Sequence, residues 1–117
     1  MAPPLETPSF AIIDSALCRL NRRGTVVKRL PPLGGLAVLE FQRIGADLLV
    51  REQPGGFLAG MPNLYRVRED FGLVWLAQLP SPLDSYATAV VEPARILCRS
   101  AAGHDVALDP HDGALRS

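Results

Sequence analysis

The sequence predicts an all-β fold built from two repeated antiparallel units, similar to propeller blades, with about eight short strands in total. The first observation is an internal repeat, which aligns residues 17–20 with 64–67 and residues 48–51 with 96–99, at shifts of 64 − 17 = 47 and 96 − 48 = 48 positions. A period in the forties is typical of supersecondary units that bury an apolar face on a neighbour. The second observation is the placement of turn formers, because 11 prolines and 10 glycines separate short β-prone runs.

The two repeats define the predicted strands in order. The first unit covers residues 17–60 and the second covers residues 63–115, within a single domain of residues 1–117 that begins with a flexible segment, residues 1–8. The predicted strands are residues 17–20, 25–30, 36–41 and 47–51 in the first unit, and residues 63–67, 73–79, 86–91, 95–99 and 105–108 in the second. The five strands predicted in the second unit leave no room for a helix there.

The N-terminal part of the first unit allows two interpretations. Phe10, Ile13, Leu17 and Leu20 would share one face of a helix, and Ser9 is a suitable N-cap. The repeat favours a strand for residues 17–20, because it aligns them with a predicted strand. A short helix over residues 9–15 remains an alternative for the segment that precedes it.

The turn and strand around Trp75 carry two further expectations. The repeat matches Gly24 with Gly72 and Val27 with Trp75, so we expect Gly72 to adopt the positive φ of the turn. Residues 73–79 are largely apolar at both alternating sets of positions, with Gln78 as the one polar residue. This pattern predicts a strand that is covered on both faces, with Trp75 in the core.

Composition and charge narrow the class of protein. Twelve basic residues balance twelve acidic ones, and 48% of the residues are hydrophobic. The balance removes the electrostatic attraction expected of a nucleic-acid or membrane-surface binder, so we expect neither partner. The basic cluster of residues 19–29 is interpreted as solvated hairpin tips. Residues 1–8 show neither a signal peptide nor the start of a membrane span, so the expected location is the cytoplasm.

The candidate reactive groups are few. Cys18 and Cys98 are far apart in sequence and are expected to be small buried residues, not a disulfide or a zinc site. His104 and His111 lie among Asp105, Asp109 and Asp112, and such groups can bind a divalent metal or transfer protons. Their spacing matches no known metal loop, and the serines lie in no nucleophile motif, so solvated turn residues are the favoured interpretation.

Three segments of the second unit carry a family resemblance: residues 63–67 with a tyrosine, the Gly-x-x-Trp of residues 72–75, and the Leu-Asp-Pro-x-x-Gly of residues 108–113. Together they resemble a blade of the quinoprotein (PQQ-like) β-propeller superfamily, whereas the first unit has valine at the aligned tryptophan position. The resemblance implies a Gly-x-x-Trp hairpin that docks on the next blade. It implies no quinone cofactor, because that depends on a complete ring and this chain holds at most two blades.

These observations favour a non-enzymatic protein-interaction module, with a partner protein or a second copy as ligand. We expect a homodimer formed through exposed strand edges, and partner contacts at Phe57, Met61 and Tyr86. The alternative is a small hydrolase or metal-dependent enzyme that uses His104, His111 and the neighbouring aspartates. A third possibility is a stable remnant of a larger propeller.

Overall fold

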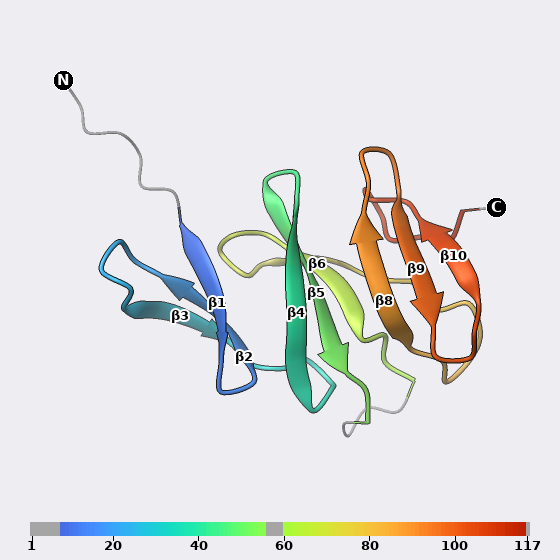
Figure 1. The fold of residues 1–117 in the computed structure, drawn as a ribbon, viewed down its shortest axis with the longest axis horizontal. Helices are drawn as coiled ribbons and strands as arrows, with labels where there is room; N and C mark the ends of the chain where they lie inside the picture. Colours follow the sequence, from blue (N-terminus) through green and yellow to red (C-terminus); the bar gives the residue numbers. More distant parts are fainter. Residues whose placement is uncertain (1–7, 56–59, 117) are drawn as a thin grey trace.

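The computed structural model describes residues 8–55 and 60–116, which form ten β-strands and no helix (Figure 1). In chain order the strands are β1 (Ser9–Ile13), β2 (Ala16–Leu20), β3 (Val26–Leu30), β4 (Ala37–Ile44), β5 (Asp47–Gln53), β6 (Leu64–Val67), β7 (Leu73–Leu76), β8 (Tyr86–Val91), β9 (Ile96–Ser100) and β10 (Asp105–Leu108). The all-β prediction is confirmed. Every predicted strand is present, although several boundaries differ.

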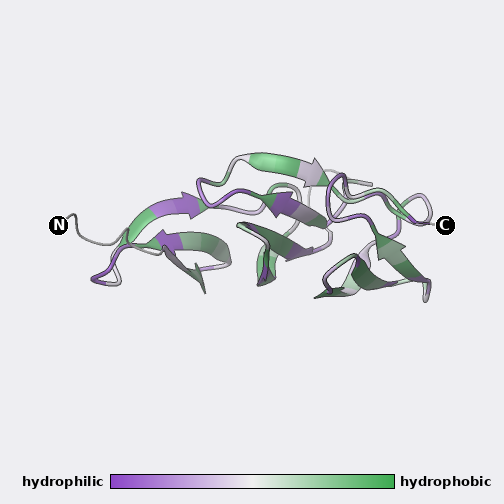
Figure 2. Ribbon diagram, turned by 90° about the horizontal axis from the view of Figure 1, so that it is seen from above, coloured by the Kyte–Doolittle hydropathy of each residue, from purple (hydrophilic) through white to green (hydrophobic). Residues whose placement is uncertain are grey.

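The strands form three antiparallel sheets, not two units. The first sheet has the order β1-β2-β3, the middle sheet β4-β5-β6-β7 and the third sheet β10-β9-β8. The sheets follow one another along the molecule without closing into a ring (Figure 2). The middle sheet joins β4 and β5 of the first repeat to β6 and β7 of the second, through pairing of β5 with β6. The prediction of two separate units is therefore wrong, because a sheet boundary falls inside each repeat.

The N-terminal segment is a strand, so the alternative of a short helix over residues 9–15 is wrong. β1 pairs with β2 in a hairpin whose two-residue turn, Asp14-Ser15, has φ values of 50° and 66°. Both turn residues are left-handed, which matches the twist of a two-residue hairpin. The adjacent β-branched Ile12 and Ile13 also favour a strand. Because side chains alternate between the two faces of a strand, Phe10 and Ile12 of β1 both face the middle sheet.

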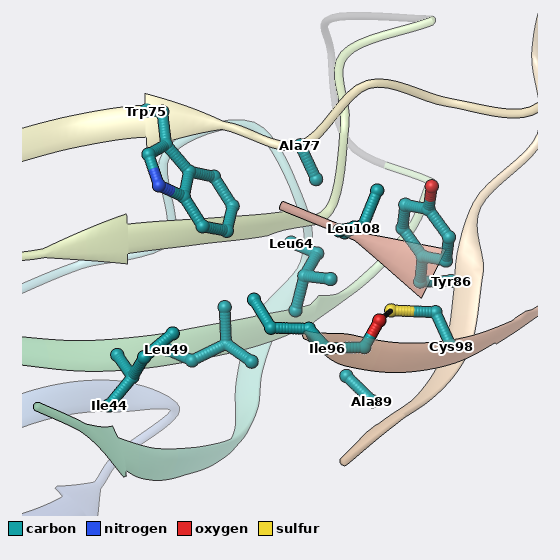
Figure 3. Close-up of a cluster of buried hydrophobic side chains, with 10 residues drawn as sticks. All are labelled: Ile44, Leu49, Leu64, Trp75, Ala77, Tyr86, Ala89, Ile96, Cys98 and Leu108. Atoms are coloured by element: carbon teal, nitrogen blue, oxygen red, sulfur yellow. Dashed lines mark hydrogen bonds between the residues drawn. The ribbon is translucent and has the colours of Figure 1, made fainter. Parts of the chain in front are cut away.

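The middle sheet packs against a neighbouring sheet on each of its two faces. Along β5, Leu48 and Val50 point to the first sheet, and Leu49 points to the third. The cluster on the first side comprises Leu17, Val38, Leu48, Val50, Tyr65 and Val67. The cluster on the other side, drawn in Figure 3, comprises Ile44, Leu49, Leu64, Trp75, Ala77, Tyr86, Ala89, Ile96, Cys98 and Leu108. The core is thus two apolar layers separated by one sheet.

The internal repeat of the sequence is also present in the structure, because equivalent strand pairs shift register at equivalent positions. The pairing of β4 with β5 shifts between Val38 and Glu40, and the pairing of β8 with β9 shifts between Tyr86 and Thr88, which are the same positions at a shift of 48. The hairpins β2-β3 and β6-β7 share a second bulge in the same way. Corresponding strands thus take equivalent places in successive sheets.

The bulge corrects the alignment around Trp75. Trp75 pairs with Arg66, and Lys28 pairs with Arg19, so Lys28 and not Val27 is the equivalent of Trp75. The turns agree with this shift. The N–H of Gly24 donates to Asn21, and the N–H of Phe71 donates to Arg68, in turns of equal length.

Two expectations about this turn and strand are therefore wrong. The positive φ lies at Phe71 (70°), the equivalent of Gly24 (80°), and not at Gly72. β7 ends at Leu76 and lies at the edge of its sheet, where Leu73, Val74 and Leu76 are 50%, 42% and 36% exposed. It is therefore not covered on both faces. Trp75 does lie in the core, as predicted.

Candidate interaction surfaces

Of the three predicted partner contacts, one is buried, one is half-buried and one lies outside the described residues. Tyr86 is buried and its hydroxyl donates to the carbonyl of Gln78, so the expectation that it is exposed is wrong. The amide side chain of Asn63 holds the Tyr86 backbone through both its N–H and its C=O. Met61 is half-buried and lines a hollow with Gly34. Phe57 lies outside the described residues, as do residues 1–7 of the predicted flexible segment.

The histidines do not gather into one site. His104 lies in the turn before β10 and His111 in the loop after it, and an intervening strand at about 3.3 Å per residue places them at opposite ends of the sheet. The N–H of His111 donates to Asp109, which lowers the pKa of that carboxyl. Asp112 accepts the N–H of Ala114. Within residues 8–55 and 60–116 no group of three or more metal-ligating side chains is present.

A buried carboxylate that the sequence analysis did not single out lies on β5. Glu52 is 1% exposed and accepts the backbone N–H groups of Leu33 (2.7 Å) and Gly35 (2.8 Å). It also accepts the hydroxyl of Tyr65, and burial together with this bond raises the pKa of Tyr65 well above its ordinary value. These donors satisfy the carboxylate, so it fixes the loop between β3 and β4 and offers no free proton acceptor.

The first candidate surface is the edge of the middle sheet at β7. The N–H of Ala77 donates to Leu64, so the antiparallel alternation turns the backbone groups of Leu76 to the unpaired side. Leu73, Val74 and Leu76 expose apolar side chains beside this edge. β7 carries no charged residue, whereas β3, the equivalent edge of the first sheet, carries Lys28 and Arg29. β7 therefore lacks the charges that usually protect an edge strand from pairing.

The second candidate surface is the outward face of the third sheet. By alternation this face bears Thr88, Val90, Leu97 and Ala107, opposite the side that packs on the middle sheet. Val90 is 54% exposed. The face is hollowed by about 580 Å³, with Arg99, Asp105 and Arg116 around the apolar residues. An apolar centre with a charged rim is typical of a protein-binding surface.

Polar contacts at the second junction, between the middle and third sheets, hold the stack together. Arg66 and Trp75 both donate to the carbonyl of Pro110, at 2.7 and 2.9 Å. Gln42 donates to the carbonyl of Ala89 and accepts the N–H of Val91. The hairpin that carries Trp75 thus docks on the loop that follows β10.

The first junction, between the first and middle sheets, uses the same positions of the repeat. Arg19, the equivalent of Arg66, donates to the carbonyl of Glu69 at 3.1 Å. Lys28, the equivalent of Trp75, donates to the carbonyl of Asp70 at 2.6 Å. In both junctions, therefore, an arginine of one sheet and its cross-strand neighbour bind the turn at the corresponding place of the next sheet.

The first candidate surface was not predicted because the sequence of β7 is compatible with two different environments. A strand that is apolar at every position is expected when both faces are covered, but it also occurs at an edge where a partner binds. The absence of Lys and Arg from residues 73–76, compared with residues 26–30, is the available signal. The prediction of buried thiols is confirmed, since Cys18 and Cys98 are both buried and free, and burial raises the pKa of Cys98 to about 12.

Comparison with protein-family models and with curated proteins finds no match for this sequence. The resemblance to quinoprotein blades therefore stays a prediction. In the part of the chain that the structure describes, there is no helix long and apolar enough to cross a membrane.

Proposed function

We propose that this protein is a non-enzymatic protein-interaction module that binds an extended segment of a partner protein along β7. The observation that carries the proposal is an uncharged edge strand with three exposed apolar side chains, Leu73, Val74 and Leu76. A segment that adds to such an edge gains main-chain hydrogen bonds, and its alternate side chains contact the exposed apolar residues.

The arrangement of polar groups supports a binding role over the alternative of a hydrolase or metal enzyme. The two histidines lie at opposite ends of β10, and Asp109 and Asp112 accept backbone N–H groups in their own loop. Glu52 is satisfied by donors of the adjacent loop and of Tyr65. Among the residues that the structure describes, no group of polar side chains favours the enzymatic alternative.

Selection from a displayed library of random ten-residue peptides tests this proposal. We expect the selected peptides to alternate β-branched or aromatic residues with polar ones, because alternate side chains of an added strand face the same side. Leu76→Lys should weaken their binding at least ten-fold, measured by fluorescence anisotropy. N-methylation of alternate peptide amides should weaken it as well, because the ladder donors are removed.

Leu83→Lys is the matched control. Leu83 is 79% exposed and apolar but lies in the connection between β7 and β8, so its replacement should leave peptide binding unchanged. Selection of no peptide, or equal binding by the Leu76→Lys and wild-type proteins, would contradict the proposal.

A further inference from the structure

The two ends of the stack of sheets are equivalent, by the repeat, to the two faces that meet at each internal junction. Each sheet has a forward face, which points toward the next sheet in the chain, and a rear face, which points toward the preceding one. Both internal junctions pack a forward face on a rear face. The forward face of the third sheet and the rear face of the first sheet face no other sheet of the described chain.

The forward face of the third sheet corresponds position by position to the forward face of the middle sheet. Leu97 pairs with Val90 as Leu49 pairs with Gln42, at a shift of 48. Leu49 is buried by the third sheet, whereas Leu97 borders the open hollow of about 580 Å³. The third sheet thus repeats the apolar centre of a junction without a sheet to cover it.

One of the two donor positions of the junctions is also repeated, whereas Ala107 stands at the position of the junction arginines, Arg19 and Arg66. The N–H of Arg116 donates to the carbonyl of Ala107, which places Arg116 across from Ala107 as Trp75 lies across from Arg66. Arg116 is therefore the third-sheet equivalent of Lys28 and Trp75, and its side chain lines the hollow.

The rear face of the first sheet is small and largely apolar. By alternation it bears Ala11, Ile13, Ala16, Cys18 and Leu20. Ala16 and Cys18, on the central strand, are at most 1% exposed, whereas Ile13 at the hairpin end is 38% exposed. Arg29 reaches across it to the carbonyl of Asp14 at 3.3 Å. The turn of residues 21–25 at its end has the hydrogen bonds of residues 68–72, the turn that accepts Arg19 and Lys28 at the first junction.

We propose that a second copy of this chain covers these faces, so that two chains join head to tail through two identical junctions. These faces are distinct from the β7 edge, and a second copy is thereby one partner of the proposed interaction module. A heterologous contact of this kind closes a ring or grows into an open filament. The three sheets approach one another most closely at β4, which contacts β1 and β2 on one side and β8 on the other. The stack is therefore curved, and this curvature favours a closed ring of two chains over an open filament.

The area of the faces also favours two junctions over one. A face of three strands about 4.8 Å apart and five residues long, at about 3.3 Å per residue, measures roughly 240 Å². One junction buries two faces, roughly 500 Å², which is in the range of weak contacts, whereas two junctions bury roughly 1,000 Å², near the lower limit of specific interfaces.

Two measurements test the proposal. Light scattering across micromolar to millimolar concentrations should show the mass of two chains, and Val90→Arg should reduce it to one. Variants that each carry one added surface cysteine report the relative orientation of the two chains. Arg116→Cys mixed with Arg23→Cys should form a disulfide-linked pair, because Arg23 is the equivalent of Asp70, whose carbonyl accepts Lys28 at the first junction. The native thiols of Cys18 and Cys98 are buried.

The mixture should cross-link at least ten-fold faster than either variant alone and than a mixture of Arg116→Cys with the control Leu83→Cys. A wild-type protein that stays one chain at millimolar concentration would overturn the proposal. Faster linking of Arg116→Cys to itself, or a mass that keeps growing beyond two chains, would overturn it too. Leu76→Lys, which tests the β7 edge, should leave the cross-link unchanged, so failure of one proposal is distinguishable from failure of the other.

Discussion

Leu49 and Leu97 allow a direct test of the stacked arrangement, because they occupy the same position of the repeat in different surroundings. Leu49 on β5 is 2% exposed and packs on the third sheet, whereas Leu97 on β9 points outward. Truncation to alanine removes the same atoms from the same place in a strand. The difference in cost therefore reports whether a further sheet covers that face.

The expected magnitudes follow from burial. Leu49→Ala removes three buried carbons, worth about 2.4 kcal/mol at about 0.8 kcal/mol each, and the residual cavity raises the cost to about 3–4 kcal/mol. Leu97→Ala removes side-chain atoms that are only partly buried and leaves no closed cavity, so about 1 kcal/mol is expected. Leu48→Ala should cost as much as Leu49→Ala, because Leu48 is buried on the opposite face of the same strand.

The assay is urea unfolding followed by the fluorescence of Trp75, the single tryptophan, with all variants made in the Val90→Arg background. This background keeps the outward face of the third sheet free of a second copy. The urea dependence of the unfolding free energy should be the same for all variants. Equal costs for Leu49→Ala and Leu97→Ala would refute the reasoning that the middle sheet alone packs against a neighbouring sheet on each of its two faces.

Three further predictions concern individual contacts. Tyr65→Phe removes the hydroxyl that donates to the buried carboxylate and should lower the free energy of unfolding by about 1.5–3 kcal/mol in urea titrations at pH 7, and a loss below 0.5 kcal/mol would contradict that contact. Burial raises the pKa of Cys98 from 9 to about 12, so the folded state favours the neutral thiol, and the stability this gives is present below pH 9 and is lost as the pH rises toward 12. Unfolding at pH 8 to 10.5 should therefore show a shallower decline in Cys98→Ala than in wild type, and equal slopes would refute this. Gly113→Ala should cost more than Gly103→Ala in thermal unfolding, since both have positive φ but only the Cβ at Gly113 would lie 2.5 Å from the indole of Trp75, and equal costs would show that the indole moves freely.

Local sequence patterns were sufficient to predict most of the strands and to detect the repeat. Turn formers and β-prone runs located the strands from residue 25 onward, because both signals act over a few residues, and the repeat located the strand of residues 17–20. The strand at residues 9–13 was ambiguous, since its hairpin depends on Asp14 and Ser15 in left-handed conformations that residues other than glycine seldom adopt.

Long-range pairing could not be predicted. The repeat showed which residues are equivalent, but the pairing of β5 with β6 across its boundary decides where a sheet ends. The exposure of Tyr86 was mispredicted because Asn63, 23 positions earlier, holds its backbone inside the core. The outward face of the third sheet was also missed, because a strand's sequence does not state which sheet lies opposite each face.

The most direct test of the stacked arrangement is a set of methyl–methyl nuclear Overhauser effects from Leu48 and Leu49, two adjacent residues of β5. The structure predicts that Leu48 shows contacts to the side chains of the first sheet, such as Leu17, and that Leu49 shows contacts to the third sheet, such as Ile96. Contacts from both leucines to the same sheet, or contacts from Leu49 to the first sheet, would contradict a middle sheet that separates two cores.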